Sequence, residues 1–361
     1  MPPAAPLRRA FALRRTALAA VLSSVALAPA IAQPPAAPDP GLARLQAQLD
    51  ELARSAGGTV GVAIVHLESG RSAYLNRAEP FPMASTVKVP LAVQLLTRVD
   101  RGELRLDSMI TVRPGDLHPG SGTLTELFNQ PGVALSARNL MELMLRISDN
   151  SATDILLRTA GGASAVNARL AALGVTGLRA DRPTVRLIAD YVGVANLPGD
   201  DVPIAEFARL NRAVPDSARR AALAAFAADP RDTATPEAMA RLLALLWRGK
   251  ALGPASTELL LDVMSRCITG EQRIKGMLPP GTRVAHKTGS LAPGQGIAGG
   301  RTVNDVGIVD LPNGAGHLVV VAFVKNADDS ARAERAIAHI ARAAHDYFTF
   351  GAAPVPERAT R

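Results

Sequence analysis

The spacing of apolar residues changes from helical to alternating near the start of the chain. Leucines recur every three or four residues from position 42 and stop before Gly57-Gly58, a typical C-terminal stop for a helix. β-branched residues then alternate with small or polar ones on both sides of a Glu-Ser-Gly-Arg turn. The pattern predicts a helix over 42–56 and strands over 59–67 and 72–76.

Helical spacing dominates the middle of the chain, and alternation returns in the last eighty residues. A Pro-Asn-Gly turn separates the last two alternating segments. The pattern predicts helices over 85–98, 136–147, 236–247, 256–267 and 331–348, and strands over 283–288, 303–310 and 317–325.

This order predicts an α/β fold with two lobes. Strands from both ends of the chain pair into one antiparallel sheet that is flanked by the N- and C-terminal helices. The helices between them form an all-helical lobe. A cleft between a sheet lobe and a helical lobe is where a site is expected.

The first 32 residues have the three parts of a signal peptide. A basic stretch reaches Arg15, an apolar run follows, and Ala30-Ile31-Ala32 is a small-x-small cleavage site. A membrane anchor is the alternative, but the apolar run is short for one. We expect a signal peptide over 1–32, a flexible spacer over 33–40, a catalytic domain over 41–350 and a disordered tail over 351–361. The mature protein is then periplasmic or secreted, without stable membrane association; the export route, general secretory or twin-arginine, stays open.

Composition narrows the classes of function. The net charge of +8 includes four arginines in the predicted signal peptide, and aromatic residues are only 3%, so we expect no nucleic-acid partner. The single cysteine, Cys267, excludes an intramolecular disulfide and a cysteine-rich metal site, and the six histidines form no cluster. We therefore expect neither a metal nor an organic cofactor, and a monomer.

Ser85 and Lys88 form the first candidate pair. Lysine is rare, with five in the chain, so its presence suggests a need for deprotonation or for a compact ammonium. If Ser85 opens a helix, Lys88 lies one turn further on the same face. A desolvated lysine can accept the proton of a serine nucleophile. The alternative is a capping serine followed by a surface lysine.

Ser148-Asp149-Asn150 follows an apolar helix. Ser148 has the chemistry to pass a proton to a leaving nitrogen, and Asn150 to hold a substrate amide. The alternative interpretation is a polar turn that caps the next helix.

Lys287-Thr288-Gly289-Ser290 ends a predicted strand. Lys287 offers positive charge to a substrate carboxylate and to Ser148, and Gly289 lets a substrate backbone approach the strand closely. The Ser290 N–H would be one oxyanion donor and the Ser85 N–H the other. The alternative is a strand end with a polar turn.

Together the three segments match the S-x-x-K, S-D-N and K-T-G motifs of the serine β-lactamase and penicillin-binding families. The aspartate of the second motif resembles class A β-lactamases, as do the stretches STVKVP, DPRDT and VAHKTG. The resemblance extends from about residue 42 to 348. It implies a β-lactamase/transpeptidase-like fold with Ser85, Lys88, Ser148 and Lys287 as catalytic residues and Asn150, Thr288, Gly289, Ser290 and Arg273 as substrate-binding residues.

The resemblance fails at deacylation. Class A enzymes release the acyl group with a glutamate in an Arg-x-Glu-x-x-x-Asn segment, but the corresponding stretch over 179–186 has no glutamate. The 139 residues from Ser148 to Lys287 are also many for the family, with the excess around 190–231. Three alternatives remain open: Glu206 activates the water, Asp181 does so, or the chain has no dedicated base.

We therefore expect a secreted serine β-lactamase that acts on a small-molecule β-lactam through an acyl-Ser85 intermediate. A D-alanyl-D-alanine peptidase or small-ester hydrolase of the same superfamily is one alternative. A β-lactam-binding sensor that stays acylated is the other.

Overall fold

A computed structural model describes residues 39–293 and 300–351. The predicted signal peptide, most of the predicted spacer and residues 352–361 of the predicted tail lie outside these ranges. Within them, no helix has the length and hydropathy that crossing a membrane requires.

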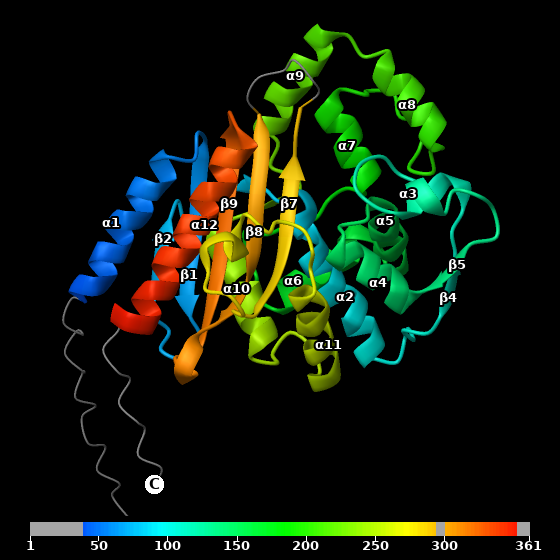
Figure 1. The fold of residues 1–361 in the computed structure, drawn as a ribbon. Coiled ribbons are helices and arrows are strands. Elements are labelled where there is room, and N and C mark those ends of the chain that lie inside the picture. The colour runs from blue at the N-terminus through cyan, green and yellow to red at the C-terminus, as the bar shows by residue number, and fades with distance from the viewer. Residues whose placement is uncertain (1–38, 294–299, 352–361) are drawn as a thin grey trace, which may run out of the picture. The chain divides into compact units, whose positions relative to one another are not determined.

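A five-stranded antiparallel sheet is the centre of the fold, with the strand order β2-β1-β9-β8-β7 (Figure 1). The central strand β9 reads LVVVAFV and is buried on both faces, as expected for a strand covered from two sides. The strands are β1 (Thr59–His66), β2 (Ser72–Leu75), β7 (Val284–Leu291), β8 (Arg301–Asp310) and β9 (His317–Ala327).

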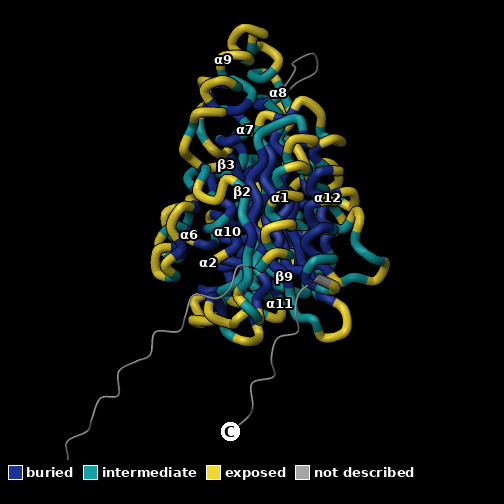
Figure 2. Tube along the Cα trace, turned by 90° about the vertical axis from the view of Figure 1, so that its left-hand side faces the viewer, coloured by how far each residue is buried: buried dark blue, intermediate teal, exposed yellow. Residues whose placement is uncertain are grey.

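Helices α1 (Pro40–Arg54) and α12 (Ser330–Asp346) cover one face of this sheet (Figures 1 and 2). Leucines of α1 and small apolar residues of α12 pack on the strands there. The other face carries a larger apolar core shared with the middle helices. These helices are α2 (Lys88–Asp100), α4 (Ala137–Arg146), α5 (Asn150–Thr159), α6 (Gly162–Ala172), α10 (Pro236–Trp247) and α11 (Pro254–Ser265). The predicted two-lobed α/β architecture is therefore confirmed.

The segment between Arg182 and Asp232 forms a separate layer at the top of Figure 1. Its helices are α7 (Thr184–Val192), α8 (Ile204–Arg212) and α9 (Asp216–Ala227), with a small apolar core of their own around Val185 and Phe207. The sequence placed the excess length of the chain in this helix-dominated stretch without giving the bounds of these three helices. The remaining short elements are α3 (Leu124–Leu127) and the strand pairs β3–β6 (Phe81–Pro82, Thr233–Ala234) and β4–β5 (Met109–Thr111, Ala134–Ser136).

Most predicted boundaries lie within three residues of the observed ones, but the helix predicted to open at Ser85 begins later. Ala84 has a left-handed φ of 48°, and a 3-10 turn, η1 (Ala84–Val87), precedes α2. Ser85 therefore lies in this tight turn, and Lys88 is the first residue of the α-helix.

Candidate active site

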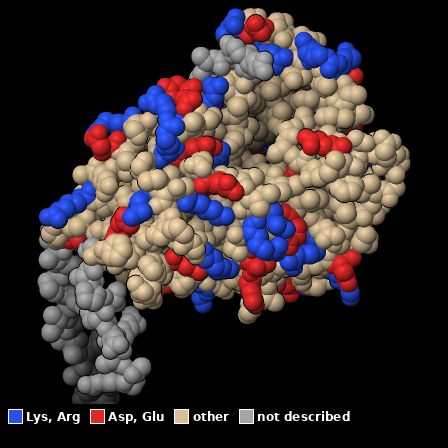
Figure 3. Space-filling model, in the orientation of Figure 1, with Lys and Arg blue, Asp and Glu red and all other residues tan. Residues whose placement is uncertain are grey.

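The three predicted motifs meet in one cleft of about 370 Å³ between the edge strand β7 and the helices. Figure 3 shows this face of the molecule hollowed there, with charges of both signs interspersed around it. Seven predicted site residues line the cleft: Ser85, Lys88, Ser148, Asn150, Arg273, Thr288 and Ser290. Lys287 and Gly289 lie behind this lining, both buried.

Gly289 fixes the distance between β7 and the turn that carries Ser85. A Cβ atom at this position would lie 2.6 Å from the Met83 carbonyl oxygen and 3.1 Å from the Ser85 amide nitrogen. Asn304 of β8 donates to the same Met83 oxygen at 3.0 Å and ties the turn to the sheet. A side chain at 289 would therefore push the Ser85 turn away from the strand.

Lys88 is 1% exposed and points at the second motif. Its Nζ donates to the Ser148 carbonyl oxygen at 2.7 Å, to Ser148 Oγ at 3.0 Å and to Asn150 Oδ1 at 3.0 Å. Burial, together with the nearby Lys287, holds the Lys88 pKa well below its ordinary value. Lys88 and Ser85 line the same cleft, and among the described residues no hydrogen bond joins their side chains.

Lys287 reaches the same serine from the edge strand β7. Its Nζ donates to Ser148 Oγ at 3.0 Å and to the Thr288 carbonyl oxygen at 2.8 Å. Burial lowers the Lys287 pKa to about 8. Ser148 has a left-handed φ of 62°, a strained conformation that places its hydroxyl between the two amines.

The other two residues of the second motif have largely structural contacts. Asp149 caps α5 through the Ala152 N–H and also accepts from the N–H groups of Thr123 and Leu124. Asn150 accepts from Lys88 through Oδ1, and its side-chain N–H donates to the Pro119 carbonyl oxygen at 2.9 Å. The cap that the sequence offered as an alternative is therefore present in the same motif that lines the cleft.

Arg273 lines the cleft, but its donors are all engaged. Two N–H groups go to Glu334, two to the carbonyls of Gly289 and Asn304, and one to Ser290 Oγ at 2.7 Å. A guanidinium has five N–H groups, so none is left for a substrate carboxylate in this arrangement. Arg273 contributes charge and orients Ser290.

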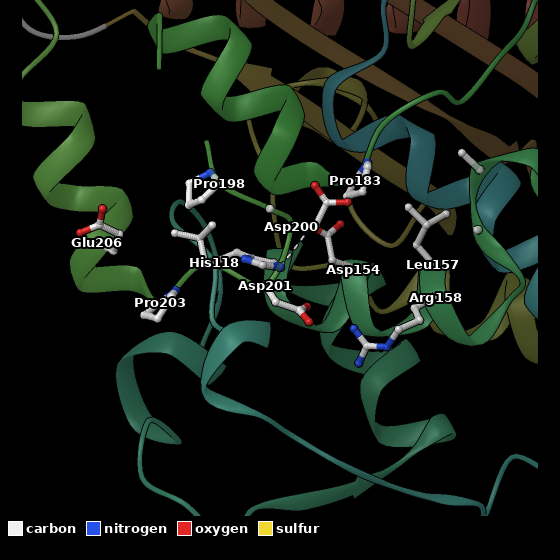
Figure 4. A pocket seen from close by; sticks show the side chains of 14 residues that line it. His118, Asp154, Leu157, Arg158, Pro183, Pro198, Asp200, Asp201, Pro203 and Glu206 are labelled. Carbon is white, nitrogen blue, oxygen red and sulfur yellow. Dashed lines mark ion pairs between the residues drawn. The ribbon is translucent and has the colours of Figure 1, made fainter. Parts of the chain in front are cut away.

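The structure does not bring Glu206 to the Ser85 cleft. Glu206 lies in the first turn of α8, where its partly exposed carboxylate pairs with Arg209 and its pKa is lowered by that hydrogen bond. It lines a second cavity of about 650 Å³, which also includes the His118–Asp154 pair (Figure 4).

Asp181 does not line the Ser85 cleft either. Its carboxylate pairs with Arg179 and accepts the Asp232 N–H at 2.9 Å. The neighbouring Arg182 does line the cleft, and its Nε donates to Asp232 at 2.6 Å. Asp232 is the one acidic residue among the described lining residues, and its carboxylate is engaged in the ion pair with Arg182.

Arg182 therefore gives the register for the Arg-x-Glu-x-x-x-Asn comparison. Counted from Arg182, Thr184 stands at the glutamate position and Ile188 at the asparagine position, and both line the cleft. Asp154 of α5 holds this segment in place by accepting from the N–H groups of Thr184 and Val185 at 2.7 and 3.0 Å.

Sequence reasoning missed the wall of the cleft that faces these polar groups. Helix α7 presents an apolar surface there, and Tyr191 ties it to Gly300, the residue before β8, by donating to the Gly300 carbonyl oxygen at 3.1 Å. Helical spacing in the stretch after Arg182 was the signal that could have found it. The wall consists of Leu187, Ile188, Tyr191 and Val192 of α7 with Ile147 and Leu291.

Comparisons with known proteins agree with this geometry. A family model described as the β-lactamase enzyme family matches residues 44–348. The β-lactamase VEB-1 of Pseudomonas aeruginosa is 26% identical over 306 residues, which cover 84% of this chain and 90% of the relative.

Two solved structures extend the likeness to the fold. A β-lactamase from Chitinophaga pinensis is 32% identical with a TM-score of 0.69, covering 84% of this chain and 98% of that one. A variant of PBP-A, solved as an acyl-enzyme complex with penicillin G, is 28% identical with a TM-score of 0.66, covering 85% and 97%. The chain belongs to the class A serine β-lactamase family.

Proposed function

We propose that this protein is a β-lactamase that opens the β-lactam amide through an acyl-Ser85 intermediate. The observation that carries the proposal is the convergence of two buried lysine amines on one serine hydroxyl in the cleft that Ser85 lines. The predicted signal peptide supports action in the periplasm or outside the cell.

In the acylation step, Ser85 Oγ attacks the β-lactam carbonyl carbon, and the C–N bond of the ring breaks. Lys88 is suited to receive the Ser85 proton, because burial and the nearby Lys287 lower its pKa and so favour the neutral amine. Ser148 Oγ accepts from both lysines, so its own proton is directed into the cleft, where it is delivered to the ring nitrogen. The proton that Lys88 took from Ser85 then passes along the Lys88–Ser148 hydrogen bond and restores the Ser148 hydroxyl. The N–H groups of Ser85 and Ser290 stabilise the oxyanion.

The substrate carboxylate is placed at the β7 end of the cleft. Lys287 and Arg273 supply positive charge there, and the hydroxyls of Thr288 and Ser290 line the surface. The apolar wall on α7 takes the acyl side chain of the β-lactam, because it is the uncharged side of the same cleft.

Deacylation adds water across the Ser85 ester and returns the serine hydroxyl. Thr184 and Ile188 offer no carboxylate and no amide to hold that water. This favours a second candidate function, in which the acyl-enzyme is long-lived and the protein acts as a β-lactam sensor or as a D-alanyl-D-alanine peptidase. The likeness to the PBP-A acyl-enzyme complex supports the same candidate.

One experiment separates these functions: nitrocefin turnover measured beside intact-protein mass spectrometry. Repeated turnover without a lasting adduct supports the β-lactamase. A stoichiometric adduct without turnover supports the sensor, and turnover of D-alanyl-D-alanine peptides alone supports the peptidase. Wild-type protein that neither turns over β-lactams nor gains their mass would contradict the proposal.

A further inference from the structure

A row of three side chains leads from the buried end of α11 to the cleft. Cys267 Sγ lies 3.2 Å from Thr269 Oγ1, and Thr269 Oγ1 lies 2.6 Å from Thr288 Oγ1. Thr269 and Thr288 line the cleft, whereas Cys267 is 3% exposed. Cys267 is therefore linked by hydrogen bonds to a residue at the proposed carboxylate site.

Behind the cysteine lies a buried imidazole. His286 is adjacent to Lys287 on β7, is fully buried, and holds Asp305 with Nδ1 at 2.9 and 3.0 Å from the two carboxylate oxygens. The Asp305 carboxylate also accepts the Ile274 N–H at 3.1 Å. Nδ1 of His286 is engaged, and its buried Nε2 has no hydrogen-bond partner among the described residues. Burial raises the Cys267 pKa, but the nearby imidazole outweighs this and the pKa is lowered to about 6.

The number of protons in the row limits how it is arranged. Each threonine hydroxyl has one proton to donate, while a thiolate only accepts. If Cys267 is a thiolate, Thr269 donates to sulfur and Thr288 must donate to Thr269. If Cys267 is a thiol, it can donate to Thr269, which then donates to Thr288. The Thr288 proton is free for the cleft only in the second arrangement.

We propose that Cys267 is a positioning residue that determines, through Thr269, whether the Thr288 hydroxyl donates to a substrate carboxylate. This inference rests on the proposed function, since it assigns Thr288 to the carboxylate of the β-lactam. It adds a residue outside the three motifs to the machinery that selects an anionic substrate.

The consequence is a pH dependence of binding with its midpoint near pH 6. Below the midpoint Cys267 is a thiol, and the Thr288 hydroxyl is free to donate to the substrate. Above the midpoint Cys267 is a thiolate, and the Thr288 hydroxyl donates to Thr269 instead. The groups that act on the sulfur are Thr269, His286 and Lys287, with Asp305 of β8 acting through His286. Lys275 also faces this residue, but its Nζ donates to the Cys267 backbone carbonyl at 2.9 Å. Burial raises the thiol pKa, while His286 and Lys287 lower it.

The test is stopped-flow acylation by benzylpenicillin between pH 5 and 7.5, analysed for the dissociation constant of the noncovalent complex. In the wild-type protein we expect this constant to rise roughly tenfold across the range, as loss of a hydrogen bond to a charged group would cause. Cys267→Ser and Cys267→Ala remove the ionising group, so both are expected to bind with a nearly constant affinity.

Thr269→Val is the decisive variant, because it keeps the titrating cysteine and removes only the connecting hydroxyl. If Cys267 acts on Thr288 through Thr269, the rise of the dissociation constant with pH must disappear in this variant. A pH-dependent dissociation constant that persists in Thr269→Val would show a direct effect of thiolate charge on the substrate and would overturn the proposal. A wild-type affinity that does not change with pH would overturn it as well. Wild-type protein that no β-lactam acylates at any pH would contradict the proposed function itself.

Discussion

Lys88 and Lys287 place their amines at the same distance, 3.0 Å, from the hydroxyl oxygen of Ser148. Both lysines are almost completely buried, and burial lowers the pKa of each. Two ammonium groups this close repel one another, so the arrangement favours a state in which one of them has lost its proton. Lys88, whose pKa is also lowered by Lys287, is the one expected to be neutral.

Removing the shared hydroxyl is the first test of this arrangement. Ser148→Ala is expected to slow acylation by nitrocefin roughly 10²- to 10³-fold, because a positioned proton donor contributes about that much. The measurement is the single-turnover rate constant of acylation, with Ser121→Ala as a control that alters a neighbouring cleft hydroxyl bonded to the Ser148 carbonyl. A Ser148→Ala rate constant within a few-fold of the control would contradict the assigned role.

The Lys287 pKa of about 8 predicts a loss of substrate affinity in mild alkali. Below pH 8 the ammonium attracts the carboxylate of the substrate, and above it the attraction fades, so KM for benzylpenicillin is expected to rise between pH 7 and 9.5. The pH dependence expected from Cys267 has its midpoint near pH 6, so it is separate from the one expected from Lys287. Lys250→Gln, at an exposed lysine, should leave the profile unchanged.

The same depressed pKa makes a prediction about stability. The unfolded chain binds the Lys287 proton up to about pH 10.5, whereas the folded protein releases it near pH 8. Between these values the unfolded state holds more protons, so this lysine's contribution to the free energy of unfolding rises with pH. Comparison of wild type with Lys287→Met by denaturant unfolding at pH 7.5 and 9.5 measures it; an unchanged difference between the two proteins would contradict the shift.

The register from Arg182 predicts how deacylation can be accelerated. Thr184→Glu combined with Ile188→Asn supplies a carboxylate and an amide at two positions that already line the cleft. We expect the acyl-enzyme lifetime with benzylpenicillin to shorten about 10²-fold, since a general base contributes at least that much. The assay is mass spectrometry of the adduct over time.

Glu206→Gln and Asp181→Asn are the matched controls for that experiment. Both carboxylates lie outside the Ser85 cleft, so each substitution is expected to leave the acyl-enzyme lifetime unchanged. A marked lengthening in either control would identify a water-activating base that the structure does not bring to the cleft.

Arg182 joins the two ends of the segment that carries α7, α8 and α9, so its removal should destabilise the fold. Its buried guanidinium donates to Asp232, Asp190 and Asp229, so Arg182→Ala leaves a buried carboxylate without its partner. We expect a loss of about 3–5 kcal/mol in the free energy of unfolding. Arg209→Ala, at an exposed pair with Glu206, should cost at most about 1 kcal/mol. Equal losses in urea denaturation would contradict this ranking.

The sequence was sufficient to predict the sheet, its flanking helices and the convergence of three motifs. Alternation and helical spacing report burial directly, as in β9 and α12, and rare lysines next to serines report chemistry. The tight turn at Ser85 could not be predicted from the sequence, because Ala84 adopts a left-handed φ of 48° that an alanine side chain by itself disfavours.

The features that the sequence did not predict depend on hydrogen-bond partners that lie far apart in the chain. Nothing near Arg273 predicts that Glu334, Gly289 and Asn304 use its donors, since these lie on other elements. The register of the deacylation segment depends in the same way on which arginine reaches Asp232. When Arg179 is taken as the arginine of the Arg-x-Glu-x-x-x-Asn segment, Asp181 stands at the glutamate position. In the structure Arg179 pairs with Asp181, and Arg182 is the arginine that reaches Asp232.

Everything depends on Ser85 as the nucleophile, and mass spectrometry of the protein after brief exposure to benzylpenicillin tests it most directly. We expect the wild-type protein to gain the full mass of the antibiotic on the peptide that contains Ser85, and Ser85→Ala to gain nothing. An adduct on another residue, or one that persists in Ser85→Ala, would contradict it.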